Sequence, residues 1–267
     1  MANMITSGKQ QATGKSVLLF SGGMDSLMFD YLMNPDVLLY IPTGSKYESI
    51  ETEKLSVLGN KGYIDNNKLV ILPDVLNLSK FERDDAIVPN RNAHLMLLAS
   101  MYGENLILGS VQGDRSFDKD PIFYEKMTSL LNHMWKEQHW TEERIFTVSS
   151  PYKETTKTEI VKEYLEKGGS KEALLESYSC YEPQELSFYA QLEYSAQPEQ
   201  TCGWCKPCFR KWISLYNNNI SIPVDYYVNN PWEAPWLEKL IPSVLEKNYR
   251  GKEDYDWCEA LTSKGVI

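Results

Sequence analysis

The stretch Ser21-Gly22-Gly23-Met24-Asp25-Ser26 decides the fold of this 267-residue chain. It follows the apolar run 16–20 and precedes residues 24–33, which suit a helix. Adjacent glycines let the backbone come close to an anion, and the free N–H groups at the start of a helix bind phosphate. The hydroxyls of Ser21 and Ser26 add further donors. The stretch therefore predicts a phosphate-binding turn between a strand and a helix, and with it the use of ATP.

Two interpretations of Asp25 remain open. Its carboxylate suits Mg²⁺ beside a phosphate, or it caps a helix after an ordinary Gly-Gly turn. The serines on both sides and the apolar strand directly before favour the phosphate-binding turn. The residues expected to bind the nucleotide are Phe20, Ser21, Gly22, Gly23, Met24, Asp25 and Ser26.

Alternating strand and helix patterns follow from residue 16 onward. Strands are expected at 16–20, 37–41, 69–72, 105–108 and 145–148. Helices are expected at 24–33, 45–58, 91–102, 121–139 and 155–167. This alternation predicts an α/β fold, a doubly wound, mostly parallel and Rossmann-like sheet with helices on both faces. Ligands of such sheets bind beyond the carboxyl ends of the strands, where the glycine turn lies.

The chain is expected to fold as one large domain with appendages. Residues 1–15 form a flexible leader and residues 16–176 the ATP-binding domain. In residues 177–216, cysteines, prolines and aromatic residues replace helical periodicity as far as Trp212, which predicts a C-terminal zinc-binding subdomain. Residues 217–267 form an aromatic-rich extension with one helix at 236–247, suited to packing or to contact between subunits of a homodimer.

Composition limits the classes of function. Hydrophobic residues at 42% and charged residues at 24% are ordinary for a soluble globular protein. No apolar run approaches the ~20 residues of a membrane span, and the N-terminus lacks the apolar core of a signal peptide. These features predict a cytoplasmic protein without a membrane partner. A net charge of −10 makes a nucleic-acid partner unexpected, because such surfaces need clustered Lys and Arg.

Four of the five cysteines have the spacing of a metal site. Cys202, Cys205 and Cys208 form two overlapping Cys-x-x-Cys steps, and Cys180 lies upstream. Zn²⁺ favours four thiolates in a tetrahedron, so the pattern predicts a closed, structural zinc site. Free core or redox cysteines are one alternative. A three-cysteine iron–sulfur cluster or a catalytic sulfur relay is another, because spacing alone does not fix the metal.

Two basic residues and a group of carboxylates are further candidates. Arg91 begins a helix, where its charge opposes the helix dipole, so we expect it to pair with a carboxylate or phosphate, in either a functional or a structural role. Asn90 before it is expected to cap that helix. Lys157 is placed to reach a phosphate, although most helix lysines lie on the surface. The carboxylates that follow the strand at 105–108 suit magnesium or a substrate amine, or belong to a solvated loop: Asp114, Asp118 and Asp120.

Together these motifs resemble the 7-cyano-7-deazaguanine synthase family of N-type ATP pyrophosphatases. The hexapeptide is similar to the pyrophosphate loop of that superfamily. The resemblance to the family runs from residue 16 to residue 212 and rests on the following segments in this order: Val88-Pro89-Asn90-Arg91-Asn92, Leu108-Gly109-Ser110, Ser150-Pro151-Tyr152 with Lys157-Thr158-Glu159-Ile160, Ser179-Cys180-Tyr181 and Cys202-Gly203-Trp204-Cys205-Lys206-Pro207-Cys208.

The resemblance implies an ATP-dependent ligase that converts a 7-carboxy-7-deazaguanine to the amide and then to the nitrile with ammonia. It implies ATP, Mg²⁺ and structural Zn²⁺ as cofactors, with zinc held by Cys180, Cys202, Cys205 and Cys208. Arg91 and Lys157 become catalytic candidates that contact phosphate or carboxylate, and Asp120 becomes the counterpart of an aspartate in the substrate loop.

Two departures from the family pattern leave alternatives open. The family usually has glycine at Asn90. Its Tyr-Pro-Asp-Cys-Arg signature is missing, and the chain reads Phe117-Asp118-Lys119-Asp120-Pro121-Ile122 instead. The enzyme could therefore stop at the amide. A tRNA sulfurtransferase of the same superfamily and a non-catalytic nucleotide-binding protein are the other hypotheses.

Overall fold

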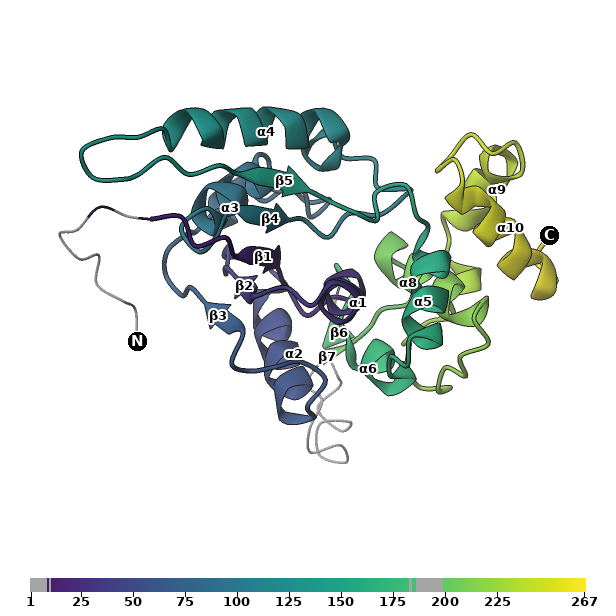
Figure 1. Ribbon diagram of the computed structural model, residues 1–267. Coiled ribbons are helices and arrows are strands. Elements are labelled where there is room, and N and C mark those ends of the chain that lie inside the picture. The colour runs from purple at the N-terminus through teal and green to yellow at the C-terminus, as the bar shows by residue number, and fades with distance from the viewer. Residues whose placement is uncertain (1–8, 10, 183, 186–198) are drawn as a thin grey trace.

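A five-stranded parallel sheet forms the centre of the computed structural model, which describes residues 9, 11–182, 184–185 and 199–267. The strand order is β3-β2-β1-β4-β5 (Figure 1). The strands are β1 Ser16–Leu19, β2 Val37–Tyr40, β3 Leu69–Ile71, β4 Asn105–Ile107 and β5 Thr147–Ser149. The predicted α/β fold with a parallel sheet is confirmed.

Alternating side chains of the strands feed two hydrophobic cores, one on each face of the sheet. On β1, Leu18 packs with the helices that include Met28 and Ile160, whereas Val17 packs with Met96 and Leu131. The strands in the middle of the sheet are thus covered by helices on both faces, as is typical of a parallel sheet. In Figure 1, α3 and α4 lie on the opposite side of the sheet from α1.

The helices of the first 176 residues follow the predicted order. They are α1 Met24–Met33, α2 Glu48–Asn60, α3 Arg91–Ala99, α4 Pro121–Met134, α5 Lys157–Glu166 and α6 Lys171–Glu176. The last was not predicted. Short 3₁₀ turns lie at Ser79–Phe81, Phe117–Lys119 and Pro231–Glu233, and β6 Gln184–Glu185 pairs with β7 Glu199–Gln200. Residues 1–8 of the expected flexible leader lie outside the described residues. Further along the leader, the hydroxyl of Thr13 donates to the buried carboxylate of Glu104.

The cysteine-rich segment contains a long helix, so the expectation that helical order is absent up to Trp212 is wrong. Helix α8 spans Lys206–Tyr216. Cys205 precedes it and Pro207 occupies its first turn. Proline is tolerated there because an N–H group in the first turn has no partner inside the helix. The spacing of Phe209, Trp212 and Ile213 places these side chains on one buried face.

The C-terminal extension contains two helices rather than the single one expected. They are α9 Leu237–Leu245 and α10 Glu253–Ser263. Trp257 of α10 is fully buried, and its ring centroid lies 4.6 Å from that of Phe209 on α8. This contact belongs to a third hydrophobic core, so the extension packs against the cysteine-rich segment. No helix in the described part of the chain is long and apolar enough to cross a membrane.

Candidate active site

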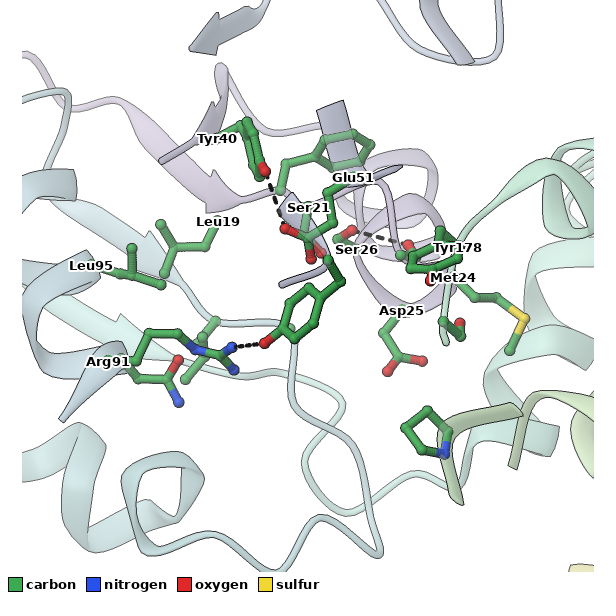
Figure 2. A pocket seen from close by; sticks show the side chains of 18 of the residues that line it. Leu19, Ser21, Met24, Asp25, Ser26, Tyr40, Glu51, Arg91, Leu95 and Tyr178 are labelled. Carbon is green, nitrogen blue, oxygen red and sulfur yellow. Dashed lines mark hydrogen bonds between the residues drawn. The ribbon is translucent and has the colours of Figure 1, made fainter. Parts of the chain in front are cut away.

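A pocket opens at the carboxyl ends of the strands, where the sequence placed the ligand site (Figure 2). Its wall combines the hexapeptide turn, the first turns of α2, α3, α5 and α8, and the segment around Cys180. Segments that are distant in sequence therefore meet around one space. Besides tyrosines and Cys180, the polar and charged side chains that line it are Ser21, Asp25, Ser26, Thr43, Glu51, Arg91, Asn92, Asp114, Lys119, Lys157, Ser179 and Arg210.

The hexapeptide forms the predicted turn from β1 into α1. Gly22 has a φ of +73°, a conformation that glycine adopts without strain. Gly23 is the residue before α1, which leaves the N–H groups of the first helical turn without partners inside the helix. All the predicted nucleotide-binding residues line the pocket except Gly22, which shapes the turn. Its carbonyl accepts from Tyr178 N at 3.1 Å, so the turn is tied to the cysteine-rich segment.

Lys157 reaches the same turn from the opposite side. Its Nζ lies 2.9 Å from Asp25 Oδ2, and the lysine is buried. Thr156 and Glu159 form a capping box that fixes Lys157 as the first residue of α5. Asp25 makes no helix cap, because its carboxylate is held by this lysine. The structure therefore places an ammonium group next to the phosphate-binding turn rather than on the surface.

Arg91 enters the pocket at the start of α3. Its Nη1 donates to the hydroxyl of Tyr47 at 2.6 Å, and the ring of Tyr47 stacks on that of Tyr181 with centroids 5.4 Å apart. Asn90 does not cap the helix with its side chain as expected. Its φ of +60° is instead the left-handed conformation, which glycine and asparagine both adopt. The family's usual glycine and this asparagine thus support the same turn.

Asp120 lies outside the pocket, which corrects its expected placement there. Its Oδ1 accepts from Phe123 N at 2.7 Å and caps α4, with Pro121 in the first turn. Asp118 does not line the pocket either, although it accepts at 2.8 Å from Nδ2 of Asn92, which does line it. Of the three candidate aspartates, Asp114 is the one that lines the pocket. The pKa of Asp114 is lowered because Lys119 and Arg210 outweigh the opposing effect of its burial.

The sequence analysis assigned no role to several pocket residues, among them Tyr47, Glu51, Lys119 and Arg210. Glu51 lies on α2, one turn after Tyr47. Burial raises its pKa to about 7, although Arg91 and the Tyr40 hydroxyl, 3.1 Å from Oε2, lower it. No local motif marks these side chains, because contacts between distant segments bring them together. A carboxylate with so high a pKa in a pocket is typical of a functional residue.

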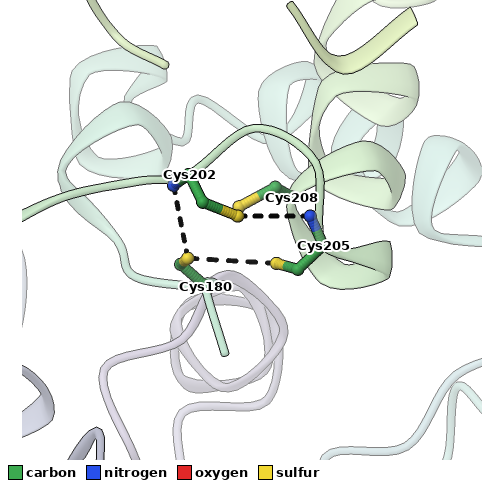
Figure 3. Close-up of side chains that lie close together, drawn as sticks. All are labelled: Cys180, Cys202, Cys205 and Cys208. Atoms are coloured by element: carbon green, nitrogen blue, oxygen red, sulfur yellow. Dashed lines mark hydrogen bonds between the residues drawn. The ribbon is translucent and has the colours of Figure 1, made fainter. Parts of the chain in front are cut away.

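The four predicted cysteines converge beside the pocket (Figure 3). Their sulfurs all lie within 4.8 Å of one another, and all four residues are buried. Cys205 N donates to Cys202 Sγ at 3.2 Å and Cys202 N donates to Cys180 Sγ at 3.4 Å. Hydrogen bonds from the thiols of Cys202, Cys205 and Cys208 lower the pKa of Cys180. Cys180 itself lines the pocket, so the cluster is part of its wall.

A comparison with protein families agrees with this arrangement. The sequence model of the family described as Queuosine biosynthesis protein QueC matches residues 38–218, more than half of the chain. The chain belongs to this family. The QueC match includes Arg91, Lys157 and all four cysteines of the cluster, whereas the phosphate-binding turn precedes it and residues 219–267 follow it. The resemblance predicted from the motifs is therefore confirmed.

Among solved structures, the chain is similar to the U34-tRNA thiolase NcsA from Methanococcus maripaludis, determined with its [4Fe-4S] cluster. The two are 15% identical with a TM-score of 0.34, and the match covers 92% of this chain and 72% of that chain. No curated protein matches the chain. Membership of the QueC family, together with the phosphate-binding turn, makes the protein an ATP-using enzyme of 7-deazaguanine synthesis.

Proposed function

We propose that the protein is an ATP-dependent ligase that converts 7-carboxy-7-deazaguanine to the amide and then to 7-cyano-7-deazaguanine. One observation carries the proposal. A single pocket joins a phosphate-binding turn, the cationic groups Arg91, Lys119 and Lys157, and the buried cysteine cluster, in a chain of the QueC family. We expect ATP, ammonia and the deazaguanine carboxylate as the reactants, and action in the cytoplasm, where thiols stay reduced.

The reaction requires activation because a carboxylate is a poor electrophile with a poor leaving group. A carboxylate oxygen attacks the α-phosphorus of ATP, and pyrophosphate leaves. Ammonia attacks the carboxyl carbon and loses a proton to solvent, and AMP leaves with the oxygen, which gives the amide. A second ATP adenylates the amide oxygen, and loss of AMP with the two nitrogen-bound protons gives the nitrile. Each step develops negative charge on phosphate oxygens, which fixed donors stabilise.

The residues of this chain fit those demands. The free N–H groups at the start of α1 and the hydroxyl of Ser21 bind the pyrophosphate portion. Lys157 is held at this place by Asp25, so its charge is ready beside the departing pyrophosphate. Arg91 and Lys119 are the candidates for orienting the substrate carboxylate. Asp25 would also hold Mg²⁺, which supplies charge neutralisation when bound.

Geometry favours zinc in the cysteine cluster. A tetrahedron with Zn–S distances of about 2.3 Å has sulfurs about 3.8 Å apart, and Cys205 Sγ lies 3.9 Å from Cys180 Sγ. A [4Fe–4S] cluster binds each thiolate to a different iron and therefore spaces the cysteine sulfurs more widely. A closed site of four thiolates has no open position, so its role would be structural. It would anchor Tyr178, Ser179 and Tyr181 in the pocket wall.

Product analysis tests the proposal. Purified protein is incubated with ATP, Mg²⁺, ammonia and 7-carboxy-7-deazaguanine, and the products are measured by mass spectrometry. We expect AMP and pyrophosphate whose release depends on both the carboxylate and ammonia. Release of ADP and phosphate, or no release, would show that the assignment is wrong. ATP binding without turnover across a panel of carboxylates would support a non-catalytic nucleotide-binding protein.

The same experiment decides where the reaction stops. In the segment that replaces the family's substrate signature, Lys119 lines the pocket, whereas Asp118 and Asp120 do not. This altered loop favours a second candidate, a ligase that releases 7-amido-7-deazaguanine. Accumulation of the amide, with no nitrile when the amide is supplied with fresh ATP, would support it. Conversion of the supplied amide to the nitrile would support the complete reaction.

A further inference from the structure

The segment 219–267, which follows the QueC match, contacts a residue of the pocket wall through the side chain of Glu253. Glu253 is the first residue of α10, and only 2% of its surface is exposed. Its carboxylate binds Arg210, a residue of α8 that lines the pocket. The rest of the segment is anchored by the core around Trp257, whose indole N–H donates to Glu253 Oε1 at 3.1 Å. A segment outside the family match thus contacts the candidate active site.

The contacts of Arg210 fix its guanidinium group in one orientation. Nε and Nη2 each donate to a different oxygen of Glu253 at 2.7 Å, the paired geometry that suits a carboxylate best. Nη1 donates to Asp114 Oδ1 at 2.7 Å, and Nη2 also donates to Gln112 O at 3.1 Å. Within the described residues, these bonds use four of the five N–H donors of an arginine. The remaining donor is on Nη1, the nitrogen beside Asp114 of the pocket wall.

The loop after β4 is shaped to admit Glu253. Gly113 has a φ of +88°, and a Cβ at this position would lie 1.7 Å from Glu253 Oε2. Gln112 Oε1 accepts from Glu253 N at 3.0 Å, and Gly113 O accepts from Arg250 Nη1. A side chain at position 113 would therefore expel the carboxylate. The glycine and its two neighbouring contacts indicate that the loop and the segment form one fitted unit.

We propose that residues 219–267 form part of the active site, with Glu253 as a positioning residue that fixes Arg210 to bind an anionic group of the ligand. This inference rests on the proposed function, in which two anions enter the pocket. The anion is either the carboxylate of the deazaguanine or a phosphate of ATP. Arg210 makes the contact, and Glu253 acts only through it.

The variant Glu253→Gln tests the inference in the full-length protein. The amide keeps the size of the side chain but sets an NH₂ group against an N–H of Arg210, which breaks the paired contact. We measure KM for ATP and for 7-carboxy-7-deazaguanine, and the calorimetric Kd of inorganic pyrophosphate and of the deazaguanine alone. Glu259→Gln, an exposed glutamate of the same helix, is the matched control. Melting temperatures report the structural cost.

We expect affinity for one of the two anions to fall about tenfold, the effect of a misplaced charged hydrogen bond. Affinity for the other should change less than twofold, and Glu259→Gln should leave both unchanged. In an Arg210→Gln background, Glu253→Gln should weaken binding no further. A lower melting temperature with both affinities within twofold of the wild type would overturn the inference, as would losses that add in the double variant.

Two arms keep the result decisive. If Glu253→Gln does not fold, Glu253→Asp keeps the charge but shortens the reach, and it should weaken the same anion; unchanged affinity would again overturn the inference. Pyrophosphate binding needs no turnover. Suppose that the wild type makes no product but Glu253→Gln binds pyrophosphate more weakly than the wild type does. This result refutes the proposed reaction and supports the role of Glu253. Turnover by the wild type, with unchanged affinities in the variant, would support the proposed reaction and refute the role of Glu253.

Discussion

Replacing Glu51 by glutamine should stabilise the fold at high pH while impairing the enzyme. The pKa of Glu51 rises from 4.5 to about 7, chiefly through burial. The folded state therefore binds more protons than the unfolded state between these two values, so stability falls as the pH rises through this window. At 1.36 kcal/mol per unit of pKa, the charged side chain costs the fold about 3 kcal/mol above pH 8. Glutamine carries no charge and still accepts from Tyr40.

Urea unfolding at pH 4.5 and at pH 8.5 measures this effect. The free energy of unfolding of Glu51→Gln should match that of the wild type at pH 4.5 and exceed it by about 3 kcal/mol at pH 8.5. Other titrating groups are common to both proteins and cancel in the difference. Glu53→Gln, on the same helix but not in the pocket wall, is the matched control. Equal stabilities at pH 8.5, or a difference that persists at pH 4.5, would refute the reasoning. Activity should fall despite the gain, since a carboxylate kept at such cost in a pocket serves binding.

Three further predictions concern the turn, the cluster and the α3 start. Lys157→Met should lower kcat/KM for ATP at least tenfold, because it removes the charge beside the phosphate site and leaves Asp25 unpaired; steady-state pyrophosphate release measures it. Metal analysis should find one zinc per chain and no iron, and Cys205→Ser should lose the zinc and lower the melting temperature; iron with sulfide would contradict the proposed site. Asn90→Gly should leave activity and stability nearly unchanged, whereas Asn90→Ala should cost about 1 kcal/mol in urea unfolding, because its φ is positive.

Local signals carried most of the fold and part of the site. The hexapeptide could be interpreted alone, because a strand, two glycines and a helix start determine its geometry within a few residues. Cysteine spacing likewise predicted which sulfurs would meet. The capping role of Asp120 could also have been predicted from the sequence, since an aspartate directly before a proline is typical of a helix start. The family pattern led instead to a substrate role for this residue, which the structure does not support.

The missed features depend on contacts between distant segments. Helices α8 and α10 were not predicted because cysteines, prolines and acidic residues obscure their apolar spacing. Their buried faces pack against each other and against segments that are distant in sequence. Lys119 and Arg210 are ordinary charged residues in the sequence, and only the packing of η2 (Phe117–Lys119) and α8 around the pocket gives them a role. Burial, which sets the pKa of Glu51, is likewise a property of the assembled fold.

The altered substrate loop and the C-terminal segment should vary together among QueC relatives. Lys119 lies 3.7 Å from Asp114, Asp114 pairs with Arg210, and Arg210 pairs with Glu253. These four alternating charges are all largely buried. Removing one member of such a series leaves a buried charge without compensation, which is strongly destabilising.

A relative with a lysine in this loop therefore needs an acid in the position of Glu253, and one without the segment needs a different residue at Arg210. An alignment of family members with and without the extension measures this pairing. Relatives that keep Lys119, Asp114 and Arg210 while lacking any acid to replace Glu253 would show that the charges are independent of one another.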